Sequence, residues 1–445
     1  MTTPTTPPTP KLRDRDRQAI LKALRAGVVP RVGLQHIQVG RKLEVSAILS
    51  DLEHAADGGA GIRFVVGRFG AGKSFFLNLA SVVALEKGFL VARADVTTDR
   101  RLHGSGGQAR ALYTELMRNL SSKARPDGGA LGSVIEKWIS DVGATAANEG
   151  GLAQALVQRL KPLQDLVGGF DLANVLTAYI RGFEAGDSGK QEAVLRWLRA
   201  EFDTKTEARQ ADLGVRAIID DADVYDYLKL MAKFARIMGY QGLVVCIDEM
   251  VVLSHRLASV RARNANYEAI LRILNDCLQG SVEGLEVIFG GTDEFLEDRR
   301  RGLYSYEALA TRLAANQFAK DGAVDLAGPV LRLKTLTPED LFVLLARIRD
   351  VFASGAPSKH LLPDDGLTAF IEHARRTLGD DYFRTPRESV MRFVGLMNLL
   401  EQDPTHDWRT ALGHVDELPV AASTSAEASG DATPDGDDDL VSFRL

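Results

Sequence analysis

Residues 67–74 of this chain are Gly67-Arg68-Phe69-Gly70-Ala71-Gly72-Lys73-Ser74, which fits the pattern G-x-x-x-x-G-K-[ST]. The residues before them, 62–66, form a short apolar run of the kind found in buried strands. The residues after them, 75–80, have the apolar content of a packed helix. A strand, a glycine-rich turn and a helix in this order predict a phosphate-binding loop. The alternative is a glycine-rich turn that matches the pattern by accident.

The residue types in this loop suit a nucleotide with several phosphates. The glycines allow the backbone to curl until successive N–H groups point at phosphate oxygens. Lys73 would neutralise the β- and γ-phosphates, Ser74 would bind Mg²⁺, and the helix that begins near Lys73 would add the positive end of its dipole. The predicted nucleotide-binding residues in this stretch are Gly67, Arg68, Phe69, Gly70, Ala71, Gly72, Lys73, Ser74 and Phe75.

A second part of the predicted site lies far downstream. Residues 242–247 form an unbroken apolar strand that ends in Asp248-Glu249. Open α/β sheets bind ligands at the carboxyl ends of buried parallel strands, so both carboxylates would lie beside the phosphate-binding loop. We expect Asp248 to hold Mg²⁺ through water and Glu249 to polarise an attacking water. The alternative is a solvated strand end.

Composition places the chain among soluble proteins of a reducing compartment. Its 445 residues suffice for two or three domains, and the net charge of −6 does not by itself indicate a nucleic-acid partner. Two cysteines, Cys246 and Cys277, make a disulfide framework unexpected. The polar, proline-rich start is no signal peptide, and nothing approaches the length of a membrane span. We therefore predict a cytoplasmic protein without membrane contact. Neither a zinc-type Cys/His cluster nor a Ser-His-Asp pattern competes with the phosphate-binding loop.

The pattern of apolar runs predicts an α/β fold with a parallel sheet, a helical insertion and a C-terminal helical lid. The predicted strands lie at residues 62–66, 89–95, 242–247, 285–291 and 330–333. The gap between the second and third strands is far longer than a crossover needs and has helical patterning. The predicted parts are a disordered arm (1–10), the nucleotide-binding core (11–334) with its insertion at about 105–238, the helical lid (335–415) and a disordered acidic tail (416–445). We also expect the helix that ends just before the first strand to pack over the base of a nucleotide.

This order of strand, phosphate-binding loop, acidic strand, later strand and helical lid resembles that of AAA+ ATPases, a class of P-loop NTPases. In such enzymes the lid and a neighbouring subunit complete the site. By resemblance, Thr292 at the tip of the later strand would orient the hydrolytic water, and the other interpretation is a simple turn. Arg387, at the start of a lid helix, resembles the lid arginine that senses the γ-phosphate, and the alternative is a surface arginine paired with a carboxylate.

Two further arginine sites are candidates for the finger that AAA+ ATPases present to the next subunit. Arg312 resembles this arginine finger, and the alternative is an ordinary charge on a helix surface. The run Arg299-Arg300-Arg301 is a competing finger, a patch that faces nucleic acid, or a solvated turn.

A narrower resemblance comes from six motifs taken in their order along the chain. They are residues 39–44 (Val-Gly-Arg-Lys-Leu-Glu), 67–74, 109–116 (Ala-Arg-Ala-Leu-Tyr-Thr-Glu-Leu), 239–249, 291–295 (Gly-Thr-Asp-Glu-Phe) and 385–388 (Thr-Pro-Arg-Glu). Together they resemble the ATP-binding proteins of bacteriophage exclusion (BREX) defence systems, an AAA+-like family akin to origin-recognition and STAND ATPases. The resemblance covers about residues 15–402. It implies ATP and Mg²⁺ as cofactors and adds Gly40 and Arg41 to the nucleotide-binding residues.

The resemblance also implies partners, namely other copies of this chain in a homo-oligomer and the other components of a phage-defence system. DNA is a further candidate, although no winged-helix module is evident between the lid and the tail. The predicted function is ATP hydrolysis within such a complex. The residues expected to act in catalysis are Lys73, Glu249, Thr292, Arg312 and Arg387. A metabolite kinase and a nucleotide-gated scaffold with little turnover are the alternatives, and measured turnover separates them.

Overall fold

The computed structural model describes residues 12–146, 151–318, 325–378, 386–403 and 405–415. The predicted arm (1–10) and the predicted acidic tail (416–445) lie outside the described residues. Within the described residues, no helix is both long and apolar enough to cross a membrane.

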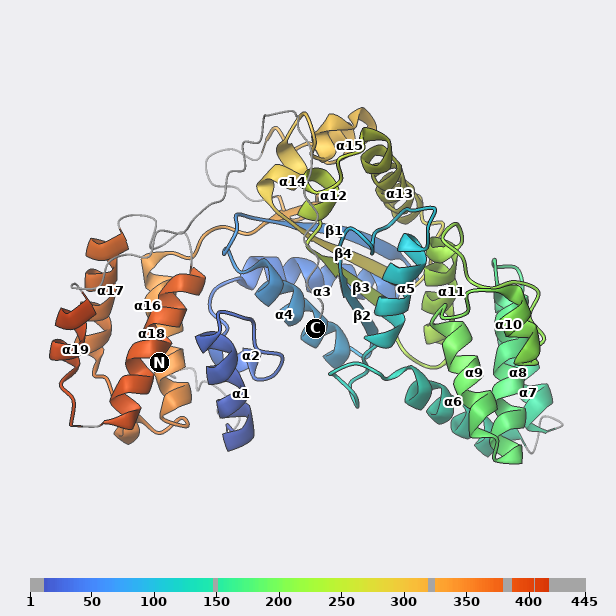
Figure 1. The fold of residues 1–445 in the computed structure, drawn as a ribbon, viewed down its shortest axis with the longest axis horizontal. Helices are drawn as coiled ribbons and strands as arrows, with labels where there is room; N and C mark the ends of the chain where they lie inside the picture. Colours follow the sequence, from blue (N-terminus) through green and yellow to red (C-terminus); the bar gives the residue numbers. More distant parts are fainter. Residues whose placement is uncertain (1–11, 147–150, 319–324, 379–385, 404, 416–445) are drawn as a thin grey trace, which may run out of the picture.

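A five-stranded parallel sheet lies at the centre of the protein (Figure 1). In sheet order the strands are β2 (Leu90–Asp95), β3 (Leu243–Asp248), β4 (Leu285–Gly291), β1 (Ala60–Val66) and β5 (Val330–Arg332). Every neighbouring pair is parallel, and most strand residues are buried because helices cover both faces. The predicted P-loop α/β fold is confirmed, and all five predicted strands are present.

The register of the strands brings the chemically distinctive segments to one edge of the sheet. Asp95 pairs with Asp248 at the ends of β2 and β3, and Val66 pairs with Gly291 at the ends of β1 and β4. The phosphate-binding loop, the Asp248-Glu249 pair and Thr292 therefore all follow strands whose carboxyl ends are neighbours.

Helices from distant parts of the chain cover the two faces of the sheet. On one face lie α3 (Lys42–Ala56) and α4 (Lys73–Glu86), which form one apolar cluster with the strands. On the other face lie α5 (Gln108–Arg118), α11 (Val224–Ile237) and α13 (Val260–Leu278). Short helices α12 (Val251–His255), α14 (Asp293–Glu297) and α15 (Glu307–Arg312) follow β3 and β4.

The long segment between β2 and β3 is helical, as predicted, apart from isolated bridges such as the one between Val91 and Ser121. Besides α5 and α11 it contains α6 (Leu131–Ala146), α7 (Leu152–Leu160), α8 (Gly169–Ala185), α9 (Ser188–Leu198) and α10 (Lys205–Gln210). In Figure 1 these five helices extend from the sheet to one end of the protein, on the right. Their apolar side chains continue the cluster that covers the sheet.

The C-terminal helices form a separate apolar cluster at the other end of the protein (Figure 1). They are α16 (Pro338–Phe352), α17 (Asp364–Leu378), α18 (Pro386–Gln402) and α19 (Trp408–Val415). The side chain of Thr337 accepts a hydrogen bond from the backbone N–H of Asp340, and Pro338 occupies the first turn, so the predicted start of α16 is confirmed.

The N-terminal helices pack with this C-terminal cluster. Ile20, Leu21 and Leu24 of α1 (Asp14–Arg25) lie among its apolar side chains, together with Ile37 of α2 (Leu34–Ile37). The first helices of the predicted core are therefore packed against the predicted lid. The domain boundaries themselves stay a prediction.

A carboxylic acid is buried between the strands and α3. Glu286 of β4 is fully buried, and within the part of the chain that the structure describes neither of its carboxyl oxygens has a hydrogen-bond partner. Arg63 is instead held by Asp51, with Nη2–Oδ1 and Nε–Oδ2 distances of 2.6 and 2.7 Å. Burial raises the pKa of Glu286 well above its ordinary value of 4.5, and the nearby Asp51 raises it further, while Arg63 opposes the shift. Glu286 therefore keeps its proton when folded at a pH at which the unfolded chain loses it.

Glu286→Gln should reduce the loss of stability that accompanies rising pH. The folded protein binds one proton more than the unfolded chain above pH 4.5, so the free energy of unfolding falls as the pH rises toward the raised pKa. One such group contributes a slope of at most about 1.4 kcal/mol per pH unit. Urea unfolding of both proteins from pH 5 to 8 measures the slopes. Equal slopes would mean that Glu286 is ionised in the folded protein.

Candidate nucleotide-binding site

The loop between β1 and α4 has the backbone geometry expected of a phosphate-binding loop. Gly70 and Gly72 have φ values of 80° and 89°, in the left-handed region that side chains with a Cβ disfavour. The Lys73 ammonium donates hydrogen bonds to the carbonyl oxygens of Gly67 and Arg68, at 2.9 and 3.0 Å. Since α4 begins at Lys73, the first N–H groups of this helix face the same space as the loop.

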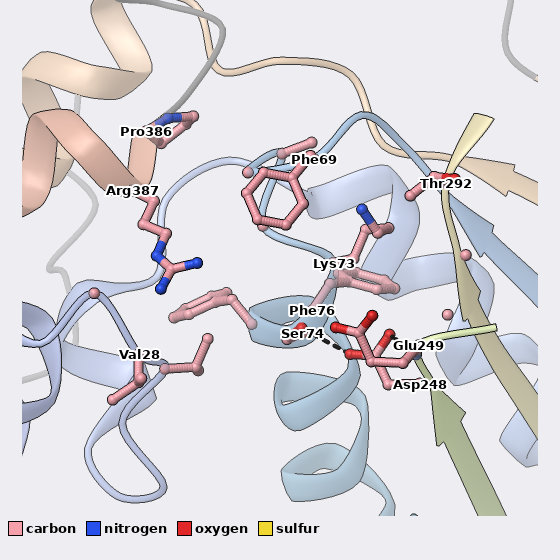
Figure 2. Close-up of a pocket in the computed structure, with 18 of the residues that line it drawn as sticks. Val28, Phe69, Lys73, Ser74, Phe76, Asp248, Glu249, Thr292, Pro386 and Arg387 are labelled. Carbon is pink, nitrogen blue, oxygen red and sulfur yellow. Dashed lines mark hydrogen bonds between the residues drawn. The ribbon is translucent and has the colours of Figure 1, made fainter. Parts of the chain in front are cut away.

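The second part of the predicted site lies directly beside this loop. The Ser74 hydroxyl donates to Asp248 Oδ2 at 2.7 Å, and the Glu249 N–H donates to Asp248 Oδ1 at 2.8 Å (Figure 2). A hydroxyl and a carboxylate that meet on one side of a phosphate-binding loop form an all-oxygen donor set of the kind Mg²⁺ prefers. These residues therefore fit the metal that the sequence implies.

Glu249 is held in an unusual backbone conformation between β3 and α12. Its φ is 58°, which is uncommon for a residue with a side chain and often marks functional sites. Burial raises its pKa, and the carboxylates of Asp248 and Asp95 raise it further, while Lys73 lowers it. A carboxylate in a cavity with a shifted pKa is a candidate for proton transfer.

Lys73 is the cation that faces these acids. Burial lowers its pKa, and the opposing influence of Asp248 and Glu249 favours the charged form. The site thus combines one ammonium with several carboxylates, a balance that suits a metal ion bound together with phosphates.

The loop and the carboxylates open into a cavity of about 710 Å³ (Figure 2). This volume is within the range of small-molecule and cofactor pockets. The half away from the phosphate-binding loop is apolar, which suits a base and a sugar. Its walls come from the segment after α1, from α4 and from the C-terminal helices, and include Leu24, Val28, Val29, Pro30, Ile37, Val39, Phe75, Leu336, Leu344, Pro386 and Val390.

Most of the predicted site residues line this one cavity. They are Arg41, Phe69, Gly70, Ala71, Gly72, Lys73, Ser74, Phe75, Asp248, Glu249, Thr292 and Arg387. Three others, Gly40, Gly67 and Arg68, are not among the lining residues, although Gly40 and Arg68 are chain neighbours of residues that are. Arg312 is not among the lining residues, and its guanidinium donates a hydrogen bond to the carbonyl of Ala308 in its own helix.

Arg41 connects the segment before α3 to the phosphate-binding loop. Its guanidinium donates to the Ala71 carbonyl at 3.1 Å and to the Glu44 carboxylate at 3.2 Å. Because the Ala71 carbonyl is in the loop, Arg41 holds the loop from outside and faces the cavity at the same time.

Thr292 and Arg387 approach the cavity from opposite sides (Figure 2). The Thr292 hydroxyl accepts a hydrogen bond from the Phe295 N–H at 3.2 Å and so caps α14. Thr292 thus caps a turn and also lines the cavity, and its role in orienting the hydrolytic water stays a prediction. Arg387, from the first turn of α18, has no hydrogen bond or ion pair through its side chain within the described residues.

The expectation that α3 packs over the base is wrong. Its residues pack on the sheet and do not line the cavity, whose apolar wall comes from the segment between α1 and α3. Sequence reasoning also missed His255 and Arg256, which line the cavity from the end of α12. No local pattern marks these residues, because only the packing of distant segments brings them together.

Gly290→Ala should disturb the metal-binding side of the site. A Cβ at Gly290 would lie 2.4 Å from Asp248 Oδ1 and 2.6 Å from Leu77 Cδ1, so the carboxylate that accepts from Ser74 has to shift. We expect Mg²⁺-dependent ATP affinity, measured by calorimetry, to fall by about tenfold or more. Gly395→Ala is the matched control, since a Cβ there meets nothing within 4 Å and affinity should not change. Unchanged affinity in the Gly290 variant would argue against Asp248 as part of the metal site.

Comparisons of the sequence with protein families, curated proteins and solved structures complete the description of the site. The family model described as "BREX system ATP-binding protein BrxC/D" matches residues 12–416, which is nearly the whole chain. No curated protein and no solved structure matches the chain. The matched range includes the phosphate-binding loop, the Asp248-Glu249 pair and the C-terminal helices. The chain therefore belongs to the family of BREX system ATP-binding proteins BrxC/D.

Proposed function

We propose that this protein binds ATP with Mg²⁺ and hydrolyses the bond between the β- and γ-phosphates, as the ATPase of a BREX phage-defence system. The family supports ATP binding and a role in phage defence. The observation that carries the hydrolysis is the meeting of Lys73, the Ser74–Asp248 pair and Glu249 in one cavity that also has an apolar half.

The proposed roles follow from the positions of the groups. The loop from Gly70 to Lys73 binds the phosphates through backbone N–H groups and one ammonium. Ser74 and Asp248 hold the metal, which supplies charge neutralisation at the β- and γ-phosphate oxygens. Glu249 orients the attacking water and accepts its proton, a role for which a raised pKa is suited.

The proposed roles of Arg387 and Arg312 depend on whether each residue lines the cavity of its own chain. Arg387 lines the cavity of its own chain, so it can stabilise charge on the transferred phosphoryl group from the lid side. Arg312 does not line that cavity, so any catalytic role requires a neighbouring copy of the chain. The assembly into a homo-oligomer, the cytoplasmic location and the contacts with other BREX components belong to this proposal.

The alternative function is a nucleotide-gated scaffold. The left-handed backbone at Glu249 favours hydrolysis over this alternative, because strain at a candidate catalytic carboxylate is the kind that active sites retain.

Lys73→Ala and Glu249→Gln should separate binding from turnover. Lys73→Ala removes the cation that faces the phosphates, so most ATP affinity should be lost. Glu249→Gln keeps the shape of the side chain but cannot accept a proton, so ATP should stay bound while hydrolysis slows by about a hundredfold or more. Equilibrium ATP binding and phosphate release measure the two effects. Undiminished hydrolysis by the Gln variant would remove Glu249 as the catalytic carboxylate, and ATP binding without turnover in the unaltered protein would favour the scaffold.

The two arginine variants should behave differently on mixing. Arg312→Ala leaves its own cavity intact, so it should bind ATP normally, lose turnover and regain part of it when mixed with Lys73→Ala protein. Arg387→Ala alters the same cavity as Lys73→Ala does. In a mixture of these two variants every chain has a defect in its own cavity, so turnover should not return, and this mixture is the matched comparison. Phosphate release over a range of protein concentrations measures both mixtures. A rate per chain that does not depend on concentration, with no recovery in the Arg312 mixture, would indicate a site completed within one chain.

A further inference from the structure

Exposed arginines without partners gather near the carboxyl edge of the sheet, next to the nucleotide cavity. Arg256 and Arg261 flank the linker between α12 and α13, while Arg299 and Arg300 follow α14. All four are exposed, and across the described ranges none of their side chains makes a hydrogen bond or an ion pair. Figure 1 shows α12, α13, α14 and α15 together at the top of the protein. We call this region, formed by residues 97–107, 255–263 and 298–301, the arginine surface. In residues 97–107 Arg100 pairs with Glu115 and Arg101 donates to backbone carbonyls, so the unpaired guanidinium groups belong to the other two segments.

Several arginines elsewhere in the protein are paired with acids. In the helical insertion, Arg110 pairs with Asp203, Arg118 with Glu201 and Arg196 with Glu207. The arginine surface includes a long stretch without any acid, since no Asp or Glu occurs from Met250 to Tyr267. In a chain with a net charge of −6, this stretch is a local reversal of sign.

Helix α13 fastens all three segments of the arginine surface through buried polar side chains. Arg263 donates to the carbonyls of Leu257 and Ala258, at 2.8 and 3.1 Å. Asn266 accepts from the His103 N–H at 2.9 Å and donates to the His103 carbonyl at 3.3 Å.

The third segment is fastened in the same way, by the Tyr267 hydroxyl, which donates to the Arg301 carbonyl. Asn266 and Tyr267 are fully buried, and Arg263 nearly so. The buried polar side chains of one helix thus form hydrogen bonds that position three loops. The backbone that carries these arginines is therefore held in place by α13.

Free guanidinium groups on a backbone held in place fit a rigid polyanion with repeated phosphates. Guanidinium binds phosphate oxygens in a bidentate manner, and contacts of this type supply sequence-independent affinity for nucleic acid. The three segments contain no Phe, Tyr or Trp, whereas proteins that bind single strands stack bases on aromatic side chains.

We propose that the arginine surface binds the phosphate backbone of duplex DNA. The inference does not need the hydrolysis proposed above. It does place the DNA beside the ATP site, because α12 begins two residues after Glu249 and α14 follows Thr292 directly in the chain.

The test compares two double charge reversals in the full-length protein. Arg261→Glu with Arg300→Glu should weaken binding to a labelled duplex, measured by fluorescence anisotropy, by about tenfold or more, and should reduce the slope of log affinity against log salt by about 2. Arg181→Glu with Arg209→Glu makes the same charge change on α8 and α10 of the insertion, where neither side chain has a hydrogen bond or ion pair in the described parts of the chain. This control should change affinity by no more than about twofold, since net charge alone has a weak effect compared with direct phosphate contacts.

Both doubles should bind ATP as the unaltered protein does, which separates a failure of this inference from a failure of the nucleotide site. Tyr267→Phe keeps every charge and releases the Arg301 carbonyl, so it should weaken duplex binding by a smaller factor. Three results would overturn the proposal: equal losses in the two doubles, no salt-dependent binding of duplex DNA by the unaltered protein, or tighter binding of single-stranded DNA or duplex RNA than of duplex DNA.

Discussion

The hydrogen bond from Ser74 to Asp248 is the contact on which the rest of the site depends. It joins the first turn of α4, which is continuous with the phosphate-binding loop, to the end of β3, which lies two strands away from β1 in the sheet. The glycine at position 290, on the strand between them, leaves room for this contact. The insertion of more than a hundred residues before β3 is compatible with the site because the register of the sheet alone fixes Asp248 beside Ser74.

The sequence predicts the residues at the phosphate-binding loop end of the cavity and not those of its apolar wall, for a physical reason. Phosphate binding needs particular residue types at fixed spacing on one turn, so residues 67–74 can be recognised from the sequence. The base side needs only apolar surface, and Val28 or Val390 look like any core residue until the chain has folded. The same limit applies to Arg256, since nothing in its neighbours shows that it lines a cavity, and to α3, whose apolar residues face the sheet instead.

The arginines show the reverse case, in which the sequence alone left several interpretations open. The run Arg299-Arg300-Arg301 was compatible with a finger, a nucleic-acid patch or a solvated turn. The structure adds that the backbone of Arg301 is held by a buried tyrosine, and that unpaired arginines from another loop lie on the same helix framework. The sequence shows where arginines occur along the chain. Only the fold shows which of their side chains have no carboxylate to pair with.

The packing of α1 with α16 and α18 has a mechanical consequence. The phosphate-binding loop is built on the sheet, but the apolar wall from Leu24 to Val39 is attached to α1 and α2, whose side chains share a core with the C-terminal helices. The cavity thus has two parts. The sheet carries the phosphate-binding loop, and the N-terminal and C-terminal helices carry the apolar wall and Arg387. A hinge movement between them would take the apolar wall and Arg387 away from the phosphate-binding loop together, so the cavity would open on both counts in a single event.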